Sequence, residues 1–167
     1  MESRAVYLVV MMNVGFTLLL TVSLAAILVV AAVVDVRTFT ISNRLNLLVA
    51  LLAPLFWWSV GLALWPGAAI QVAVAVGVFA LLAIAFYTGM MGGGDVKLAA
   101  ALALWFSPAE TVKFLVIMSI AGGALTLLVV AINKFRSKSG RPEIPYGVAI
   151  AIGGLAILAQ RFLNQFA

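Results

Sequence analysis

Two aspartates have the surroundings in this chain that best suit chemistry. Asp35 closes a long apolar run, in AAVVDVRT, and Asp95 follows a glycine triplet, in GGGDVKLA. An acid at the centre of a membrane helix costs about 2.5–3.5 kcal/mol, so such residues usually have a function. Two carboxyls can hydrolyse an amide together, because one takes a proton from the attacking water while the other donates to the carbonyl oxygen. Carboxyls that lie close together can share the proton that this requires.

Each aspartate also has a purely structural interpretation. Asp95 could cap a helix that starts at Val96, because Asp is favoured at helix N-caps. Asp35 could be a boundary residue that pairs with Arg37. The triplet at 92–94 could admit a substrate backbone, or it could be a plain linker. It does not match the GxxxxGK[ST] pattern, so we expect no phosphate loop.

The residue types that are missing exclude most other catalytic chemistry. The 167 residues include no Cys and no His. Thiolate zinc sites, disulfides and Ser-His or Cys-His catalysis are therefore excluded, and we expect no cofactor and no metal. The net charge of +5 comes from short basic loops between apolar runs. We assign these loops to topology and lipid contact rather than to nucleic-acid binding.

The elements that must position the acids are membrane helices. Hydrophobic residues make up 66% of the chain and charged residues 9%, whereas soluble domains are roughly 25% charged. About 20 apolar residues cross the hydrocarbon core. The chain has six apolar runs, of which the fourth is short: 5–34, 45–64, 67–91, 96–107, 111–132 and 144–163. We therefore expect an all-α polytopic membrane protein with six transmembrane helices in one domain over residues 1–167. Gly122-Gly123 and Gly153-Gly154 should let helices pack closely.

The basic residues predict how this bundle is oriented. If all six runs span, the loops 35–44, 92–97 and 133–143 share one face. That face holds seven of the ten basic residues: Arg37, Arg44, Lys97, Lys134, Arg136, Lys138 and Arg141. The positive-inside rule makes this face cytoplasmic and puts both termini outside. Because the chain crosses the membrane twice between Asp35 and Asp95, the two acids should return to the same face at similar depth.

These motifs resemble those of the type IV prepilin peptidases, which are GxGD intramembrane aspartyl proteases. The segment 92–98, GGGDVKL, resembles the GxGDxKL motif, and the segment 35–43, DVRTFTISN, resembles DxRxxxIPN with Ser42 at the usual proline. The segment 144–147, IPYG, resembles a third landmark at the start of the last helix. The resemblance implies a GxGD-protease-like bundle with Asp35 and Asp95 as the catalytic pair. It also implies a set of residues that support the site: Gly92, Gly94, Lys97, Arg37, Asn43, Pro145 and Gly147.

The same resemblance implies a substrate and a location. The substrate would be a prepilin or pseudopilin whose short basic leader precedes an apolar helix, cut at the cytoplasmic surface of the bacterial inner membrane. Larger members carry an extra domain with CxxC motifs and also N-methylate their product. This chain has no Cys and is similar to the short branch of Flp/Tad pili, which implies peptidase activity alone.

Two functions of other classes stay open on the sequence. The acids could relay protons in a proton-coupled transporter, or the chain could be a non-catalytic subunit of a pilus or secretion assembly. A relay favours further acids along a path through the bilayer, and the apolar runs contain none at their centres. An assembly subunit would tolerate the loss of both aspartates.

The expected helix ends suggest different roles for the two acids. Asp95 would sit at a helix start, where backbone N–H groups favour a carboxylate, and Asp35 at a helix end, where carbonyl groups disfavour it. We therefore expect Asp95 to be the resting base and Asp35 the resting acid.

Overall fold

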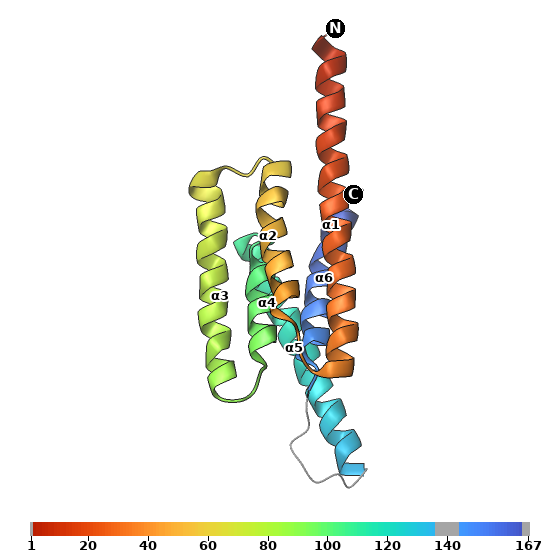
Figure 1. Ribbon diagram of the computed structural model, residues 1–167, viewed down its shortest axis with the longest axis vertical. Coiled ribbons are helices and arrows are strands. Elements are labelled where there is room, and N and C mark those ends of the chain that lie inside the picture. Colours follow the sequence, from red (N-terminus) through yellow and green to blue (C-terminus); the bar gives the residue numbers. More distant parts are fainter. Residues whose placement is uncertain (1, 136–143, 165–167) are drawn as a thin grey trace.

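The chain forms a bundle of α-helices in the computed structural model, which describes residues 2–135 and 144–164 (Figure 1). Side chains are described for residues 13–134 and 144–164. Each apolar run overlaps one α-helix, in the expected order. The helices are α1 (Glu2–Thr38), α2 (Asn43–Ser59), α3 (Ala69–Tyr87), α4 (Gly93–Ala103), α5 (Pro108–Phe135) and α6 (Tyr146–Asn164), and a short π-helical turn, η1 (Leu64–Ala68), leads into α3. The all-α class is therefore confirmed.

Only some of these helices are long enough to support the expectation of six spans. Within the described residues, four segments are long and apolar enough to cross a membrane: Asn13–Thr38, Leu64–Tyr87, Pro108–Lys134 and Tyr146–Asn164. With 17 residues in α2 and 11 in α4, these helices rise about 26 Å and about 17 Å, against a hydrocarbon core of about 30 Å. In Figure 1, α4 ends below the level that α2 and α3 reach. The fourth element is thus a short inner helix.

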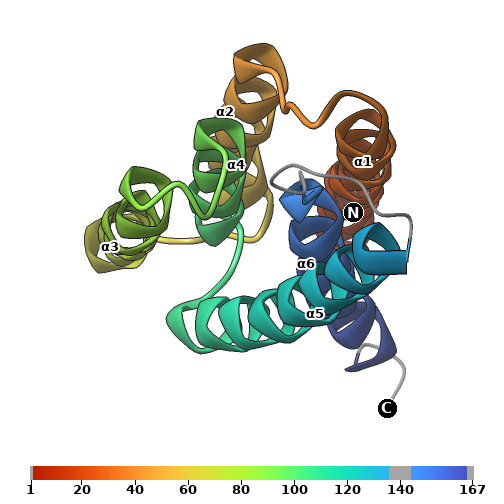
Figure 2. The same cartoon turned by 90° about the horizontal axis from the view of Figure 1, so that it is seen from below.

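The helices form two groups of three. In one group α4 packs between α2 and α3, and in the other α6 packs between α1 and α5, as the view from below shows (Figure 2). Contacts of α1 with α2 and of α4 with α6 join the groups. The buried core follows this arrangement, since α4 and α6 supply many of its residues. The outer faces of α1, α3 and α5 expose large apolar side chains such as Val22, Ile84 and Val116, which suits contact with lipid.

Small residues let α6 approach its neighbours, as expected for Gly153-Gly154. A Cβ added at Gly153 would lie 3.1 Å from the carbonyl oxygen of Phe114, and one at Gly154 would lie 2.8 Å from Leu28. Gly123 differs, because nothing lies within 4 Å of such a Cβ there. Gly153 and Gly154 therefore allow close helix packing, while Gly123 faces open space.

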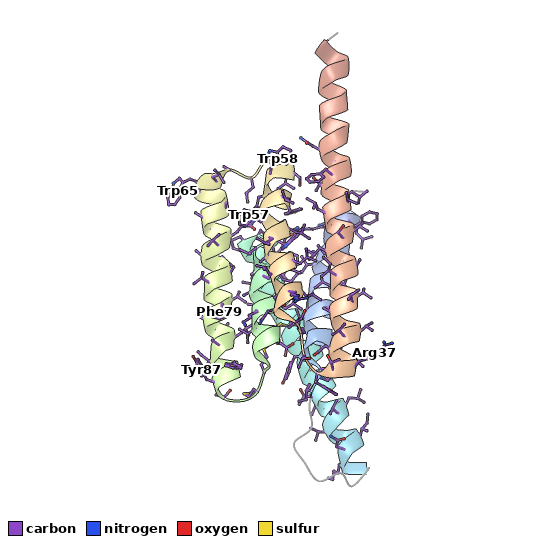
Figure 3. The ribbon with its side chains drawn as sticks, in the orientation of Figure 1. Arg37, Trp57, Trp58, Trp65, Phe79 and Tyr87 are labelled. Carbon is purple, nitrogen blue, oxygen red and sulfur yellow. The ribbon has the colours of Figure 1, made fainter. Side chains whose placement is uncertain are left out.

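Exposed aromatic residues mark the two ends of the bundle. Trp58 and Trp65 lie at one end, with 73% and 82% of their surface exposed, and Tyr87 lies at the other end with Arg37 (Figure 3). Aromatic residues are enriched at membrane–water interfaces, so these residues suit the two surfaces of a bilayer. Three bases of the expected cytoplasmic face, Arg136, Lys138 and Arg141, lie outside the described residues.

Candidate active site

Asp35 lies in the last turn of α1 and is held by the first turn of α6. Its side chain is 2% exposed, and its Oδ2 accepts a hydrogen bond of 2.6 Å from the backbone N–H of Gly147. Gly147 can donate at this distance because it has no side chain. A Cβ added there would lie 2.8 Å from Oδ2 and 2.9 Å from the Cβ of Asp35. A distant part of the chain thus fixes the position of this carboxyl.

Asp95 lies in the first turn of α4. Its side chain is 8% exposed, and its Oδ2 accepts a hydrogen bond of 3.2 Å from the backbone N–H of Gly92, the N-cap residue. The expectation that this helix begins at Val96 is wrong, since α4 starts at Gly93. Asp95 is therefore the third helical residue, and it stabilises the helix start by bonding back to the cap.

Ile41, in the connection between α1 and α2, links the surroundings of the two acids. A Cβ added at Gly94 would lie 2.6 Å from the carbonyl oxygen of Ile41. One added at Gly147 would lie 2.8 Å from the Cδ1 of the same residue. Asp35 and Asp95 lie near enough to interact electrostatically across this contact. The structure thus brings together two acids from separate apolar runs, at one end of the molecule.

Asn46 supports the turn that carries Asp95, and our sequence analysis did not identify it. Its Nδ2 donates to the carbonyl oxygen of Gly94 at 2.9 Å. Its Oδ1 is buried and has no hydrogen-bond partner among the described residues, which typically costs about 1–3 kcal/mol. An amide in the first turn of an apolar helix, three positions after Asn43, is the feature that could have revealed it. A buried acceptor without a partner beside two acids marks a place where another molecule can bind.

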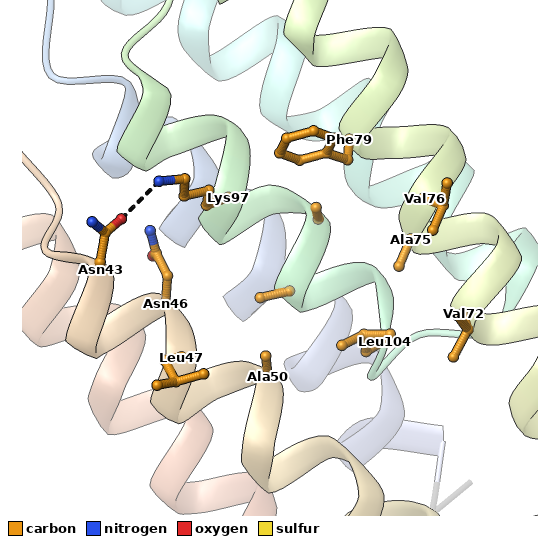
Figure 4. A pocket seen from close by; sticks show the side chains of 12 residues that line it. Asn43, Asn46, Leu47, Ala50, Val72, Ala75, Val76, Phe79, Lys97 and Leu104 are labelled. Carbon is orange, nitrogen blue, oxygen red and sulfur yellow. Dashed lines mark hydrogen bonds between the residues drawn. The ribbon is translucent and has the colours of Figure 1, made fainter.

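Of the other expected supporting residues, Lys97 and Pro145 lie against the bundle, whereas Arg37 does not. Lys97 donates from Nζ to the Oδ1 of Asn43 at 2.9 Å, which joins α4 to α2 beside the acids (Figure 4). Pro145 is buried immediately before α6. Arg37 is exposed and extends away from the bundle (Figure 3). Among the side chains described, it forms no ion pair with Asp35, so the alternative of a simple boundary pair has no support.

Ser42 keeps the turn in the shape that a proline would give it. Its φ of −69° and ψ of 145° match the φ near −65° to which a proline ring is restricted. Its hydroxyl also accepts a hydrogen bond of 3.3 Å from the backbone N–H of Leu45, and so caps α2. Ser42 therefore has a backbone angle that a proline could also take, and its hydroxyl adds a helix cap.

Both carboxyls lie at a helix N-terminus. This changes the expectation that only Asp95 is favoured as a carboxylate. Asp35 faces the start of α6 through Gly147, although it belongs to the end of α1. Asp95 faces the start of its own helix through Gly92. The bond to Asp35 is shorter, at 2.6 Å against 3.2 Å, and short bonds of this kind favour the ionised acceptor. Asp35 does lie in the last turn of α1 and Asp95 in the first turn of α4, as the helix-end argument assumes. Because the start of α6 also faces Asp35, the assignment of base and acid stays a prediction.

The arrangement supplies what acid–base hydrolysis needs. Two buried carboxyls interact, and neither has a basic partner within ion-pair distance in the described chain. One can therefore hold the proton that the other lacks. Across the described ranges, no group of three or more Asp, Glu, His or Cys residues could hold a metal ion.

Comparison with known proteins gives one match. The profile of the type IV leader peptidase family matches residues 22–127. This range covers more than half of the chain and contains both aspartates, whereas the IPYG segment at 144–147 lies beyond it. No curated protein and no solved structure matches the chain.

Proposed function

Because the chain belongs to the type IV leader peptidase family, and is thus an aspartic leader peptidase, we propose that Asp35 and Asp95 are its catalytic pair. The observation that carries the proposal is that both acids are buried, interact electrostatically and lack a basic partner among the described side chains. Membership of this family favours a leader peptidase over a transporter or a non-catalytic assembly subunit. It does not identify the catalytic residues.

In the proposed mechanism, water attacks the carbonyl carbon of the bond to be cut. The ionised carboxylate removes a proton from this water as the new C–O bond forms, and the protonated carboxyl donates its proton to the carbonyl oxygen. The C–N bond then breaks as the nitrogen takes a proton from one carboxyl. A hydroxyl of the tetrahedral intermediate gives its proton to the other carboxyl, which re-forms the carbonyl and restores the singly protonated pair. The backbone N–H groups of Gly147 and Gly92 hold the two carboxyls in fixed orientations throughout.

The proposed substrate is a prepilin or pseudopilin of the Flp type, whose basic leader precedes an apolar segment. We propose that the enzyme cleaves this leader without N-methylating the product. Two features of the chain support the narrower activity. Only residues 39–42 connect α1 to α2, so no extra domain is inserted there. No Cys is present to form a CxxC pair.

The proposed location is the bacterial inner membrane, with the aspartates facing the cytoplasm and both termini outside. The described bases Arg37, Arg44 and Lys97 lie in or beside the connections at the end that carries the acids, which supports this orientation. The N-terminus of α1 and the C-terminus of α6 point toward the opposite end (Figure 1).

The test is cleavage of a defined precursor by the purified protein in liposomes. The wild type should release the leader. When S-adenosylmethionine is present, the mass of the mature product should show an unmethylated N-terminus. Asp35→Asn and Asp95→Asn should each lower the rate by at least about 10²–10⁴-fold, the usual contribution of acid–base catalysis. Both variants should unfold thermally like the wild type. Near wild-type cleavage by either one would contradict the assignment.

A further inference from the structure

An open groove lies between α2, α3 and α4, and its lining includes neither aspartate. Its volume is about 440 Å³, within the range of roughly 300–1,000 Å³ typical of ligand clefts. Its lining is apolar over most of its length, with side chains such as Ala50 and Val76. The polar side chains gather at one end, where Asn43, Asn46 and Lys97 lie together (Figure 4).

The polar end of the groove adjoins the turn that carries Asp95. Asn46 holds the carbonyl oxygen of Gly94, the residue before this acid, at 2.9 Å. Lys97 follows the acid by two positions and reaches across to α2. From there the groove follows α4 toward Leu104 (Figure 4). A chain lying in the groove would therefore have one end near the turn that carries Asp95.

This polar end has hydrogen-bonding capacity that the described residues do not use. The Oδ1 of Asn46 is a buried acceptor without a partner in the described chain. An ammonium group has three donors, and for Lys97 the structure gives one hydrogen bond, to Asn43, and no ion pair within the described side chains. A peptide backbone offers both an N–H for the amide oxygen and a C=O for the ammonium. An acyl chain of a lipid offers no donor for Asn46.

We propose that this groove binds the apolar segment of the precursor, on the product side of the bond that is cut. Asn46 and Lys97 bond the backbone of this segment, and the apolar lining receives its side chains. The inference rests on the proposed function, because it takes a leader peptide followed by an apolar segment as the substrate. Binding of this kind positions the bond before the apolar segment beside Asp95.

Cross-linking tests the groove without requiring catalysis. The chain has no Cys, so a single introduced cysteine reports one position. In liposomes and in an Asp35→Asn background, Val76→Cys should form a disulfide with a precursor that carries a cysteine in its apolar segment. Leu81→Cys is the control, because Leu81 is 57% exposed on α3 and does not line the groove. Equal cross-linking at both positions, or none at Val76, overturns the proposal. In that case, a phospholipid that the wild type retains in native mass spectrometry would be the occupant of the groove.

Kinetics provide a second test with a matched pair of variants. Ala50→Phe fills the groove, whereas Leu51→Phe places the same side chain on an exposed face of α2 outside it. Ala50→Phe should raise KM for the precursor by about tenfold with little change in kcat, because it removes binding shared by substrate and transition state. Leu51→Phe should match the wild type. An unchanged KM in Ala50→Phe overturns the groove proposal. A wild type that cleaves no precursor contradicts the proposed function instead, and the cross-linking result then decides whether the groove binds the precursor.

Discussion

The acids at the two ends of the inner helices have opposite surroundings. At one end, Asp35 and Asp95 accept hydrogen bonds from backbone N–H groups and have no basic partner among the described residues. At the other end, Glu110 accepts bonds of 2.7 Å from both Nε and Nη2 of Arg161, and it also bonds the backbone and hydroxyl of Ser107. We call the first group the active end and the second the closed cluster.

The closed cluster also completes the end of the short helix α4. Because α4 stops early, the connection to α5 leaves backbone carbonyls at membrane depth, where water is scarce. Trp57 donates to the carbonyl oxygen of Leu104 at 2.7 Å, and Arg161 donates to that of Trp105 at 2.8 Å. The guanidinium of Arg161 also lies 5.5 Å from the ring centre of Phe56.

The presence or absence of partners for these acids distinguishes structural from functional charge in this protein. Every group of the closed cluster described above has a partner within the chain, so its charges are neutralised by structure. The active end keeps two acids without a counter-ion and one amide oxygen, that of Asn46, without a partner. Unused capacity of this kind is costly in a membrane protein, and here it lies at the proposed catalytic pair.

The largest effect should come from removing close approach at the active end. Gly147→Ala and Gly94→Ala add a Cβ that would lie 2.8 Å from the Oδ2 of Asp35 and 2.6 Å from the carbonyl oxygen of Ile41. Displacement of a catalytic group by about 1 Å can cost on the order of 10²-fold in rate, so we expect a loss of this size in the cleavage assay. Gly123→Ala is the control, since it faces open space, and it should keep full activity. Wild-type cleavage by Gly147→Ala would show that the first turn of α6 does not position Asp35.

The next effect concerns stability rather than rate. Arg161→Met leaves Glu110 without its counter-ion, and the two side chains are only 24% and 25% exposed. We expect a loss of about 2–3 kcal/mol in the free energy of unfolding, between the values for exposed and fully buried pairs. Cleavage by the folded fraction should stay unchanged.

Two further variants check this interpretation by thermal or denaturant unfolding in detergent. Lys113→Met removes an exposed base near the same end of α5, and it should have little effect. Combining Glu110→Gln with Arg161→Met should recover part of the loss, because no uncompensated charge then remains. Equal destabilisation by Lys113→Met would mean that the closed cluster contributes no more than a surface charge.

The smallest effect is the location of one proton. The shorter hydrogen bond to Asp35 favours the ionised form of that residue, so the shared proton should reside mainly on Asp95. An infrared band of a protonated carboxyl in the free enzyme near neutral pH should therefore disappear in Asp95→Asn. Loss of the band in Asp35→Asn instead would restore the assignment that the helix ends alone suggested. The titration belongs to the pair in either case.

Much of the architecture was predictable, because apolar runs and basic loops are properties of local sequence. They gave the helix order, and they predicted that both acids lie at one end. The start of α4 was missed because glycine disfavours helices, while the bond from Gly92 to Asp95 stabilises a start within the triplet. The contacts of Asn46 with Gly94 and of Arg161 with Glu110 were also missed. They join positions about 50 residues apart, and no periodicity marks them.

Both ends of the molecule depend on α6, which follows all the other helices in the chain. Gly147 supplies the N–H that holds Asp35, and Arg161 supplies the charge that neutralises Glu110. During synthesis, which proceeds from the N-terminus, the earlier helices can insert and pair before either group exists. The peptidase can therefore assemble its acids only after residue 147 has been made, and it can close its opposite end only after residue 161. A nascent chain that stalls before α6 would carry both aspartates in the membrane without the backbone contact that holds Asp35.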